Sequence, residues 1–158
     1  MTLDIREAVP GEEGLITAFI RKLAQYEEKL DEVTAREEDV AAALFGPTPR
    51  CHCALAFWNG EPAGFALWFY NFSSFEGKAG IYLEDLFVEA HLRGKGIGKA
   101  LIKTLARRCV AEGLPRFQWW VLDWNQPAIE VYRAMGAKPM DEWTVFRVSG
   151  PELEELAR

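Results

Sequence analysis

The chain has 158 residues, of which 49% are hydrophobic and 27% charged, and its formal net charge is −6. This size and composition are those of one globular domain with a full hydrophobic core, here expected over residues 1–158. Nucleic-acid binding relies on basic surface, and no apolar run reaches the roughly 20 residues of a membrane span. We therefore expect no nucleic-acid or membrane partner. A cytoplasmic location is expected because the first residues lack the pattern of a signal peptide.

The N-terminal third predicts one strand followed by two helices. Alternating residues predict a strand over 2–9, and apolar residues at helical spacing predict a helix over 15–28. Thr34 and Glu37 have the spacing of a capping box, which predicts a second helix that continues to Leu44.

Two strands are expected next, over 51–58 and 63–72, flanking Asn59-Gly60. This dipeptide favours a hairpin, although we expect a loop of more than two residues. The first strand begins with Cys51-His52-Cys53, a pattern that could suggest a metal site. Side chains of a strand alternate between faces, so the two thiols and the imidazole cannot close on one ion. We expect buried thiols and no metal.

The second half alternates strands with helices. The strands are expected over 80–88, 116–122 and 143–148, and the helices over 100–111, 127–136 and 151–157. Antiparallel strands followed by strand–helix–strand crossovers define an α/β fold. We expect a mixed, mostly antiparallel twisted sheet flanked by helices.

The stretch Arg93-Gly94-Lys95-Gly96-Ile97-Gly98-Lys99 is the most informative part of the chain. It leads from an apolar strand into a helix, and its glycines allow a tight turn. The first amides of that helix have no partners inside it and lie at its positive end. With three cations beside them, they form a site suited to phosphate or diphosphate.

Two common nucleotide loops do not fit this stretch. A Walker A loop needs a hydroxyl residue after Gly98-Lys99, where the chain has Ala100, and a glycine in the place of Arg93. A dinucleotide fingerprint that starts at Gly94 needs a glycine where the chain has Lys99. A solvated turn without a ligand remains the alternative.

Glu84 and Asp85 are two acids inside an apolar strand. Burying them unpaired is costly, and a period of two sends them to opposite faces. We expect at least one of them to open on a cleft, where it can act as a base. A salt bridge at the strand end is the alternative for either acid.

Asn125 and Tyr132 are the polar residues of interest further along the chain. Asn125 precedes a helix, so capping is its first expected role and binding of a ligand amide its second. Tyr132 shares a helix face with apolar residues, which favours a place in the core. A tyrosine hydroxyl, with an ordinary pKa of about 10, can also protonate a departing thiolate, since thiols titrate near about 8.5.

The strand 82–88, the loop 93–98 and the segment 125–136 together resemble the GCN5-related N-acetyltransferase superfamily, whose acetyl-CoA loop reads Q/R-x-x-G-x-G/A. The resemblance extends over most of the chain and is closest to the diamine acetyltransferases. The segments that carry this closer resemblance are Leu23-Ala24-Gln25-Tyr26-Glu27, Tyr82-Leu83-Glu84-Asp85, Val121-Leu122-Asp123-Trp124-Asn125-Gln126 and Glu142-Trp143. The segment 121–126 is more similar to the thialysine members of this branch. Ser73 stands near the place of an Asp in the polyamine members.

The resemblance implies an acetyl-CoA-dependent enzyme in which a small cationic amine attacks the thioester directly. It implies a homodimer with substrate sites near the subunit interface. Glu84 would accept the ammonium proton, through water, and Tyr132 would protonate the CoA thiolate. The positions implied for acetyl-CoA are Leu86, Phe87, Val88, Arg93, Gly94, Lys95, Gly96, Ile97, Gly98, Lys99, Asn125, Gln126, Pro127, Ala128 and Tyr132. The positions implied for the acceptor are Tyr26, Glu27, Glu84, Asp85, Trp119 and Glu142.

Thialysine or a lysine-like amino acid is the first expected acceptor, and a di- or polyamine is the second. Acetylation of a protein lysine or N-terminus is an alternative at the level of the reaction. An acyl-CoA-binding sensor without turnover is the non-enzymatic alternative.

Overall fold

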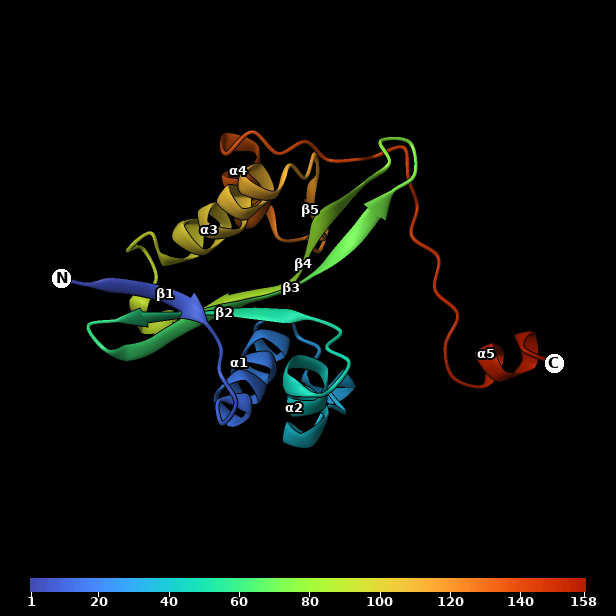
Figure 1. Cartoon of the computed structure of the whole chain (residues 1–158), viewed down its shortest axis with the longest axis horizontal. Coiled ribbons are helices and arrows are strands. Elements are labelled where there is room, and N and C mark those ends of the chain that lie inside the picture. The colour runs from blue at the N-terminus through green and yellow to red at the C-terminus, as the bar shows by residue number, and fades with distance from the viewer. The chain divides into compact units, whose positions relative to one another are not determined.

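The computed structural model describes residues 1–158, which divide into two compact units, Met1–Trp120 and Val121–Arg158 (Figure 1). The strands of the first unit are β1 (Leu3–Glu7), β2 (His52–Trp58), β3 (Glu61–Ser73), β4 (Lys78–Val88) and β5 (Phe117–Trp119). Its helices are α1 (Glu13–Tyr26), α2 (Glu37–Phe45) and α3 (Ile97–Glu112), with short 3₁₀ helices η1 (Leu30–Glu32) and η2 (Ala90–Leu92). The second unit contains α4 (Gln126–Ala134) and α5 (Pro151–Leu156).

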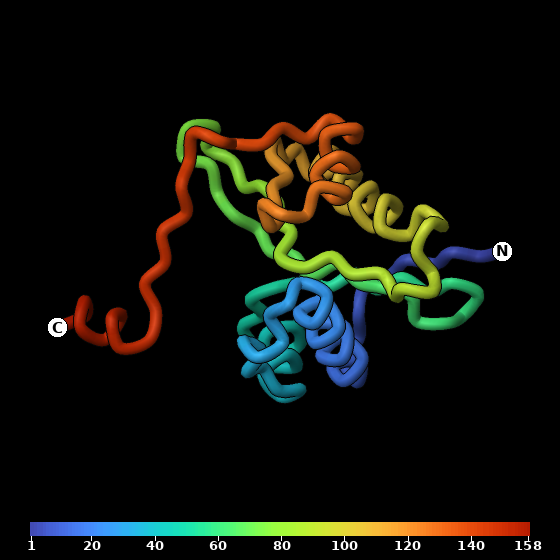
Figure 2. The backbone as a smooth tube through the Cα atoms, turned by 180° about the vertical axis from the view of Figure 1, so that it is seen from behind, coloured from blue at the N-terminus to red at the C-terminus, as the bar shows by residue number.

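The first unit is built on one sheet with the strand order β1-β2-β3-β4-β5, in which only the β4–β5 pair is parallel. The expected mixed, mostly antiparallel α/β fold is confirmed. Helices α1 and α2 cover one face of the sheet and α3 covers the other, as the views from the front and from behind agree (Figure 2). None of the helices is both long and apolar enough to cross a membrane.

The turn between β2 and β3 is tighter than the sequence suggests. Trp58 pairs directly with Glu61, so the loop consists of Asn59 and Gly60 alone. Their φ angles are +50° and +82°, which match the type I′ turn that Asn-Gly favours. The expectation of a longer loop is wrong because Glu61 and Pro62 already belong to the ladder.

Helix α2 begins later than its expected cap. Arg36 is the capping residue, with an extended backbone, and its N–H donates to the carboxylate of Asp39 at 2.9 Å. Thr34 therefore lies outside the helix, and the expected capping box is wrong by two residues. The acidic side chains of the first turn suit the positive end of this helix.

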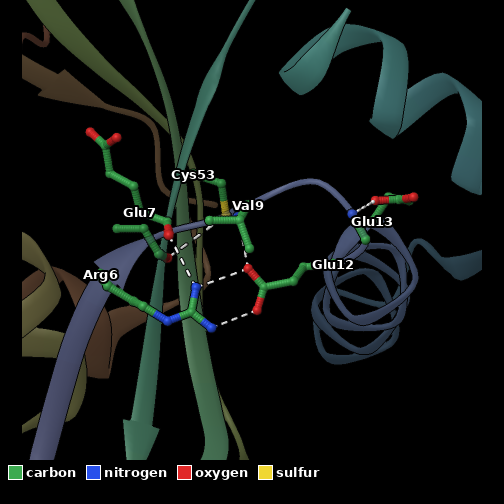
Figure 3. A network of polar contacts seen from close by, with 8 residues as sticks. Arg6, Glu7, Val9, Glu12, Glu13 and Cys53 are labelled. Carbon is green, nitrogen blue, oxygen red and sulfur yellow. Dashed lines mark hydrogen bonds and ion pairs between the residues drawn. The ribbon is translucent and has the colours of Figure 1, made fainter.

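An ion pair fixes the turn between β1 and α1 (Figure 3). The guanidinium of Arg6 donates to both carboxylate oxygens of Glu12, at 2.9 and 2.7 Å. Glu12 also accepts the backbone N–H of Val9 at 2.8 Å. The hydrogen bond from Arg6 is the largest cause that holds the pKa of Glu12 below its ordinary value. This contribution to stability is present above the unfolded-state pKa and is lost as the pH falls through the folded-state value.

Helix α1 is attached to the sheet by an aromatic cluster. Phe19 is 1% exposed, and its ring centre lies 5.5 Å from that of Phe65 and 5.9 Å from that of Phe87. Leu23, one turn further along the helix, belongs to the same core. Because Phe65 and Phe87 belong to β3 and β4, this cluster determines where the C-terminal end of α1 lies on the sheet.

The second unit lacks the strand that the sequence predicts over 143–148. Residues 143–149 form no helix or strand, and the side chains of Trp143 and Phe146 are 73% and 91% exposed. A strand needs a neighbouring backbone to complete its hydrogen bonds, and no other segment of Val121–Arg158 is a strand. The apolar pattern therefore indicated a preference for extended structure, but it does not specify a neighbouring strand with which this segment could pair.

Candidate active site

The glycine loop between η2 and α3 has the geometry of an anion site. Gly94 and Gly96 have φ angles of +82° and +80°, which other residues adopt only with strain. Gly96 is the N-terminal capping residue of α3, and no side chain caps this helix. The first amides of α3 are thus directed at whatever lies in front of the helix, at its positive end.

Two of the three cations in the loop have partners inside the protein. Arg93 donates from Nε to the carbonyl oxygen of Val88 at 3.1 Å. Its guanidinium carbon also lies 5.1 Å from the ring centre of Tyr26, at the end of α1. The ammonium of Lys95 lies 5.4 Å from the ring centre of Trp58. Arg93 thus connects the loop to β4 and α1 in addition to placing positive charge near the helix end.

The last part of β4 has an unpaired edge. Its register with β5 covers only Ile81–Leu83. On the other side, the N–H of Glu89 donates to the carbonyl oxygen of Ala63, and residues of an antiparallel strand direct their backbone groups to alternate sides. Leu86 and Val88 therefore direct their backbone groups to the edge that β5 leaves open. The carbonyl oxygen of Val88 already accepts from Arg93 there, so the backbone groups of Leu86 and the N–H of Val88 are the ones available to a ligand. An extended ligand can bind such an edge as an added strand does.

A β-bulge in β4 changes the direction of the two acids. Leu83 pairs with Trp68 and Asp85 with the adjacent Leu67, so Glu84 is the extra residue. Leu67 packs against the core beneath α1, and its partner Asp85 lies on that face. Alternation up to Leu83 places Glu84 on the same face. The expectation of opposite faces is wrong because the bulge interrupts the period of two.

Glu27, just after α1, completes a cluster of three acids with Glu84 and Asp85. Burial and then the negative charges of Glu84 and Glu27 raise the pKa of Asp85 to about 7. Burial also raises the pKa of Glu27. None of the three forms an ion pair with a cationic side chain. Glu27 and Asp85 are partly buried, and Glu84 is exposed. Acids that repel one another are stabilised by a bound cation, so this face suits a cationic ligand.

Trp119, a position implied for the acceptor, is the last residue of β5. This strand ends three residues earlier than expected because its pairing with β4 stops at Leu83, immediately before the bulge. The ring of Trp119 meets that of Phe117 edge to face, with 4.9 Å between centres.

The remaining predicted residues belong to the second unit. Asn125 is the residue before α4, but its side chain makes no capping hydrogen bond. Capping, its first expected role, is wrong because its ψ of 66° departs from the extended backbone of a capping residue. Asn125 is 8% exposed, Tyr132 is partly buried on α4, and Glu142 is exposed. The site predicted from the sequence thus includes residues of both units.

The Cys51-His52-Cys53 segment alternates between faces as predicted. Cys53 belongs to the core beneath α1, whereas the His52 ring stacks on Trp68, with 4.5 Å between centres. No group of three or more His, Cys, Asp or Glu residues lies close enough together to hold a metal ion. Sequence reasoning missed that Cys51 lies near the acids, whose charges, after burial, raise the pKa of its thiol.

Comparison with known proteins defines the class to which this fold and site belong. The model of the acetyltransferase (GNAT) family matches residues 17–137. The chain therefore belongs to the GNAT family; it is an acetyl-transferring enzyme, and its cosubstrate is acetyl-CoA. The glycine loop, the uncapped start of α3 and the open edge of β4 all lie within the matched residues.

Some relatives are similar to this chain over nearly all of its length, and others over part of it. The chain is 40% identical over 164 residues to thialysine N-epsilon-acetyltransferase of Bos taurus, an alignment that covers 97% of this chain and 96% of that protein. It is 43% identical over 94 residues to L-ornithine N5-acetyltransferase of Arabidopsis thaliana, covering 60% and 41%. Among solved structures, an integron cassette protein from the mobile metagenome of V. cholerae is 28% identical, with a TM-score of 0.82 and coverage of 100% and 99%.

Proposed function

We propose that this enzyme acetylates the primary amine of a small cationic molecule, with thialysine or a lysine-like amino acid preferred over di- and polyamines. The observation that carries this proposal is the cluster of Glu27, Glu84 and Asp85 on the face covered by α1, three acids that form no ion pair within the chain. The charge of Lys29 acts on Glu27 alone and is outweighed by burial. The bovine relative, named for its action on thialysine, supports the order of preference. We propose that Tyr26, Trp119 and Glu142 also line the site that binds the acceptor.

The donor is proposed to bind along β4 and the glycine loop. The open edge at Leu86–Val88 suits the pantetheine arm, and Arg93–Lys99 suits the diphosphate, for the reasons of geometry given above. Residues 125–128 of the second unit are proposed as further donor contacts. The family match at residues 17–137 runs through both units, which supports the proposal that they form one catalytic domain.

The proposed reaction begins with loss of a proton from the substrate. A lysine-like ammonium has a pKa of about 10.4, so its deprotonation at pH 7 costs about 4.6 kcal/mol. Glu84 takes this proton through a water molecule, and the amine attacks the thioester carbonyl. As the tetrahedral intermediate collapses, the C–S bond breaks and Tyr132 protonates the departing thiolate. The nitrogen, now part of the amide, loses its second proton, which restores the hydroxyl of Tyr132. The products are the N-acetylated amine and free CoA.

Binding of the amine is expected to strengthen as the pH rises through 7. Without a ligand, Asp85 keeps its proton below its pKa of about 7 and loses it above. A bound cation favours the charged carboxylate, so the complex holds fewer protons than the free enzyme, and affinity increases with pH. Thialysine should bind about tenfold more tightly at pH 8 than at pH 6. Titration calorimetry on the enzyme saturated with CoA, which cannot transfer an acetyl group, measures this directly.

The Asp85→Asn variant is the control for this pH dependence. It should bind thialysine more weakly, with an affinity that changes little between pH 6 and pH 8. A wild-type affinity that is independent of pH, or an Asn variant that keeps the wild-type slope, would remove Asp85 from the acceptor site.

The reaction class is tested by measuring CoA release with a panel of amines. Thialysine, lysine, putrescine, spermidine, spermine and a lysine-containing peptide are compared by kcat/KM. The proposal predicts the highest value for thialysine or lysine and the lowest for the peptide. A peptide that exceeds every small amine would favour protein acetylation. Binding of acetyl-CoA without CoA release for any amine would favour the sensor.

We also propose that the active enzyme is a homodimer. The segment 143–148 exposes large apolar side chains, among them Trp143 and Phe146, and such surfaces are typical of interaction sites. Sedimentation velocity at micromolar concentration should show twice the mass of the chain, 17.9 kDa, and Phe146→Asp should shift the enzyme toward the monomer. A wild-type enzyme that is monomeric while fully active would contradict this proposal.

A further inference from the structure

A line of exposed cations extends from the glycine loop along α3. Lys99, Lys103 and Arg107 are spaced four residues apart, so they lie on one side of the helix, one turn after another. All three are exposed. The opposite side of α3 is buried in the first unit through Leu101, Leu105 and neighbouring apolar residues.

This arrangement is electrostatically unfavourable for the chain alone. Like charges four residues apart on a helix repel, and a cation in the first turn, such as Lys99, opposes the positive end of the helix dipole. No acid lies in the first turn of α3. Arg108 is paired with Glu7 and Glu112, but the three cations of the line have no ion-pair partner in residues 1–158. A bound anion would be attracted by these cations and by the positive end of the helix, and would offset the repulsion among them.

The donor carries a suitable anion beyond its diphosphate. CoA has a separate phosphate on the 3′ position of its ribose, next to the diphosphate in the molecule. With the diphosphate at the first turn of α3, a cation one turn further lies about 6 Å along the helix. We propose that Lys103 binds the 3′-phosphate of CoA and makes the enzyme selective for CoA over 3′-dephospho-CoA. This inference rests on the proposed place of the diphosphate at Gly94–Lys99.

The test compares the binding of CoA and 3′-dephospho-CoA by titration calorimetry, without an acceptor and without turnover. The wild-type enzyme should bind CoA about tenfold more tightly than 3′-dephospho-CoA, the effect of one hydrogen bond to a charged group. Lys103→Gln should lose most of this preference by weakening CoA binding about fivefold to tenfold, with little change for 3′-dephospho-CoA. Retained folding of the variant is checked by its unfolding midpoint.

Two variants that remove the same charge serve as controls. Arg107→Gln lies one turn further along the same side of α3, and Lys78→Gln lies at the start of β4. Both should keep the wild-type preference for CoA. Equal weakening of both ligands by Lys103→Gln would overturn the contact, and so would a loss of preference in Arg107→Gln as large as that in Lys103→Gln. If the wild-type enzyme binds neither ligand, the proposed donor site itself is wrong. If it binds CoA and 3′-dephospho-CoA equally well, the Lys103 contact is wrong and the donor site is unaffected.

Discussion

Replacing Tyr132 by phenylalanine is expected to lower kcat by about a hundredfold or more, the usual loss when a general acid is removed. The substitution deletes one hydroxyl and keeps the ring, so packing on α4 should change little. Since the hydroxyl is proposed to act on the departing thiolate, its loss should affect the transition state and not the binding of the donor. The affinity for acetyl-CoA should stay within about twofold of the wild-type value, because no phosphate contact is removed.

Single-turnover CoA release measures the chemical step of this variant, and calorimetry with CoA measures donor binding. Tyr70→Phe is a matched control, because Tyr70 donates to Glu112 at 2.8 Å, on the side of the sheet away from the acids. It should retain wild-type turnover. Unchanged turnover in Tyr132→Phe would remove Tyr132 from the mechanism, and an equal loss in both variants would indicate a general structural effect.

Replacing Phe19 by alanine is expected to lower the free energy of unfolding by about 3–5 kcal/mol, the range measured for large aromatic side chains removed from cores. Phe19 is 1% exposed and contacts the rings of Phe65 and Phe87. Its removal leaves a cavity between α1 and the two strands that lead to the acids and the glycine loop. Phe19→Leu fills part of that cavity and should lose less stability.

Urea unfolding followed by tryptophan fluorescence measures this loss. Phe75→Ala is the matched control, because Phe75 is 97% exposed and its removal should change stability by less than about 0.5 kcal/mol. A loss of under about 1 kcal/mol in Phe19→Ala would show that α1 is not held on the sheet by this cluster.

Elements with a local signal were predicted well from the sequence. Ile97, Leu101, Leu105 and Cys109 follow the period of a helix, and all four are buried on α3. Gly113 ends that helix with a φ of +69°, as glycine does after many helices. These features depend on neighbouring residues alone, so a single sequence carries them.

Features that depend on distant partners were not predictable in the same way. The bulge at Glu84 arises from the register between β3 and β4, which the residues of β4 do not specify by themselves. The segment 143–148 has the alternation of a strand, yet a strand also requires a neighbouring backbone. Both errors concern pairing, and the first determines on which face the acids lie.

The proposed donor and acceptor sites differ in how far the sequence predicts them, for the same reason. The glycine loop is a contiguous motif, and the family match supports its connection to acetyl-CoA. The acids come together from α1 and β4, and their mutual effect on the pKa of Asp85 follows only from the fold. The sequence predicted each acid individually, but it did not predict that they share one face.

The most direct test of the proposed function follows one reaction to its products. Purified enzyme is mixed with acetyl-CoA and thialysine, free thiol is recorded over time, and the product is identified by mass spectrometry. The proposed function predicts one N-acetylated thialysine for each CoA released, at a rate that Glu84→Gln reduces. Enzyme that binds acetyl-CoA tightly but forms no acetylated thialysine, lysine or polyamine would contradict it.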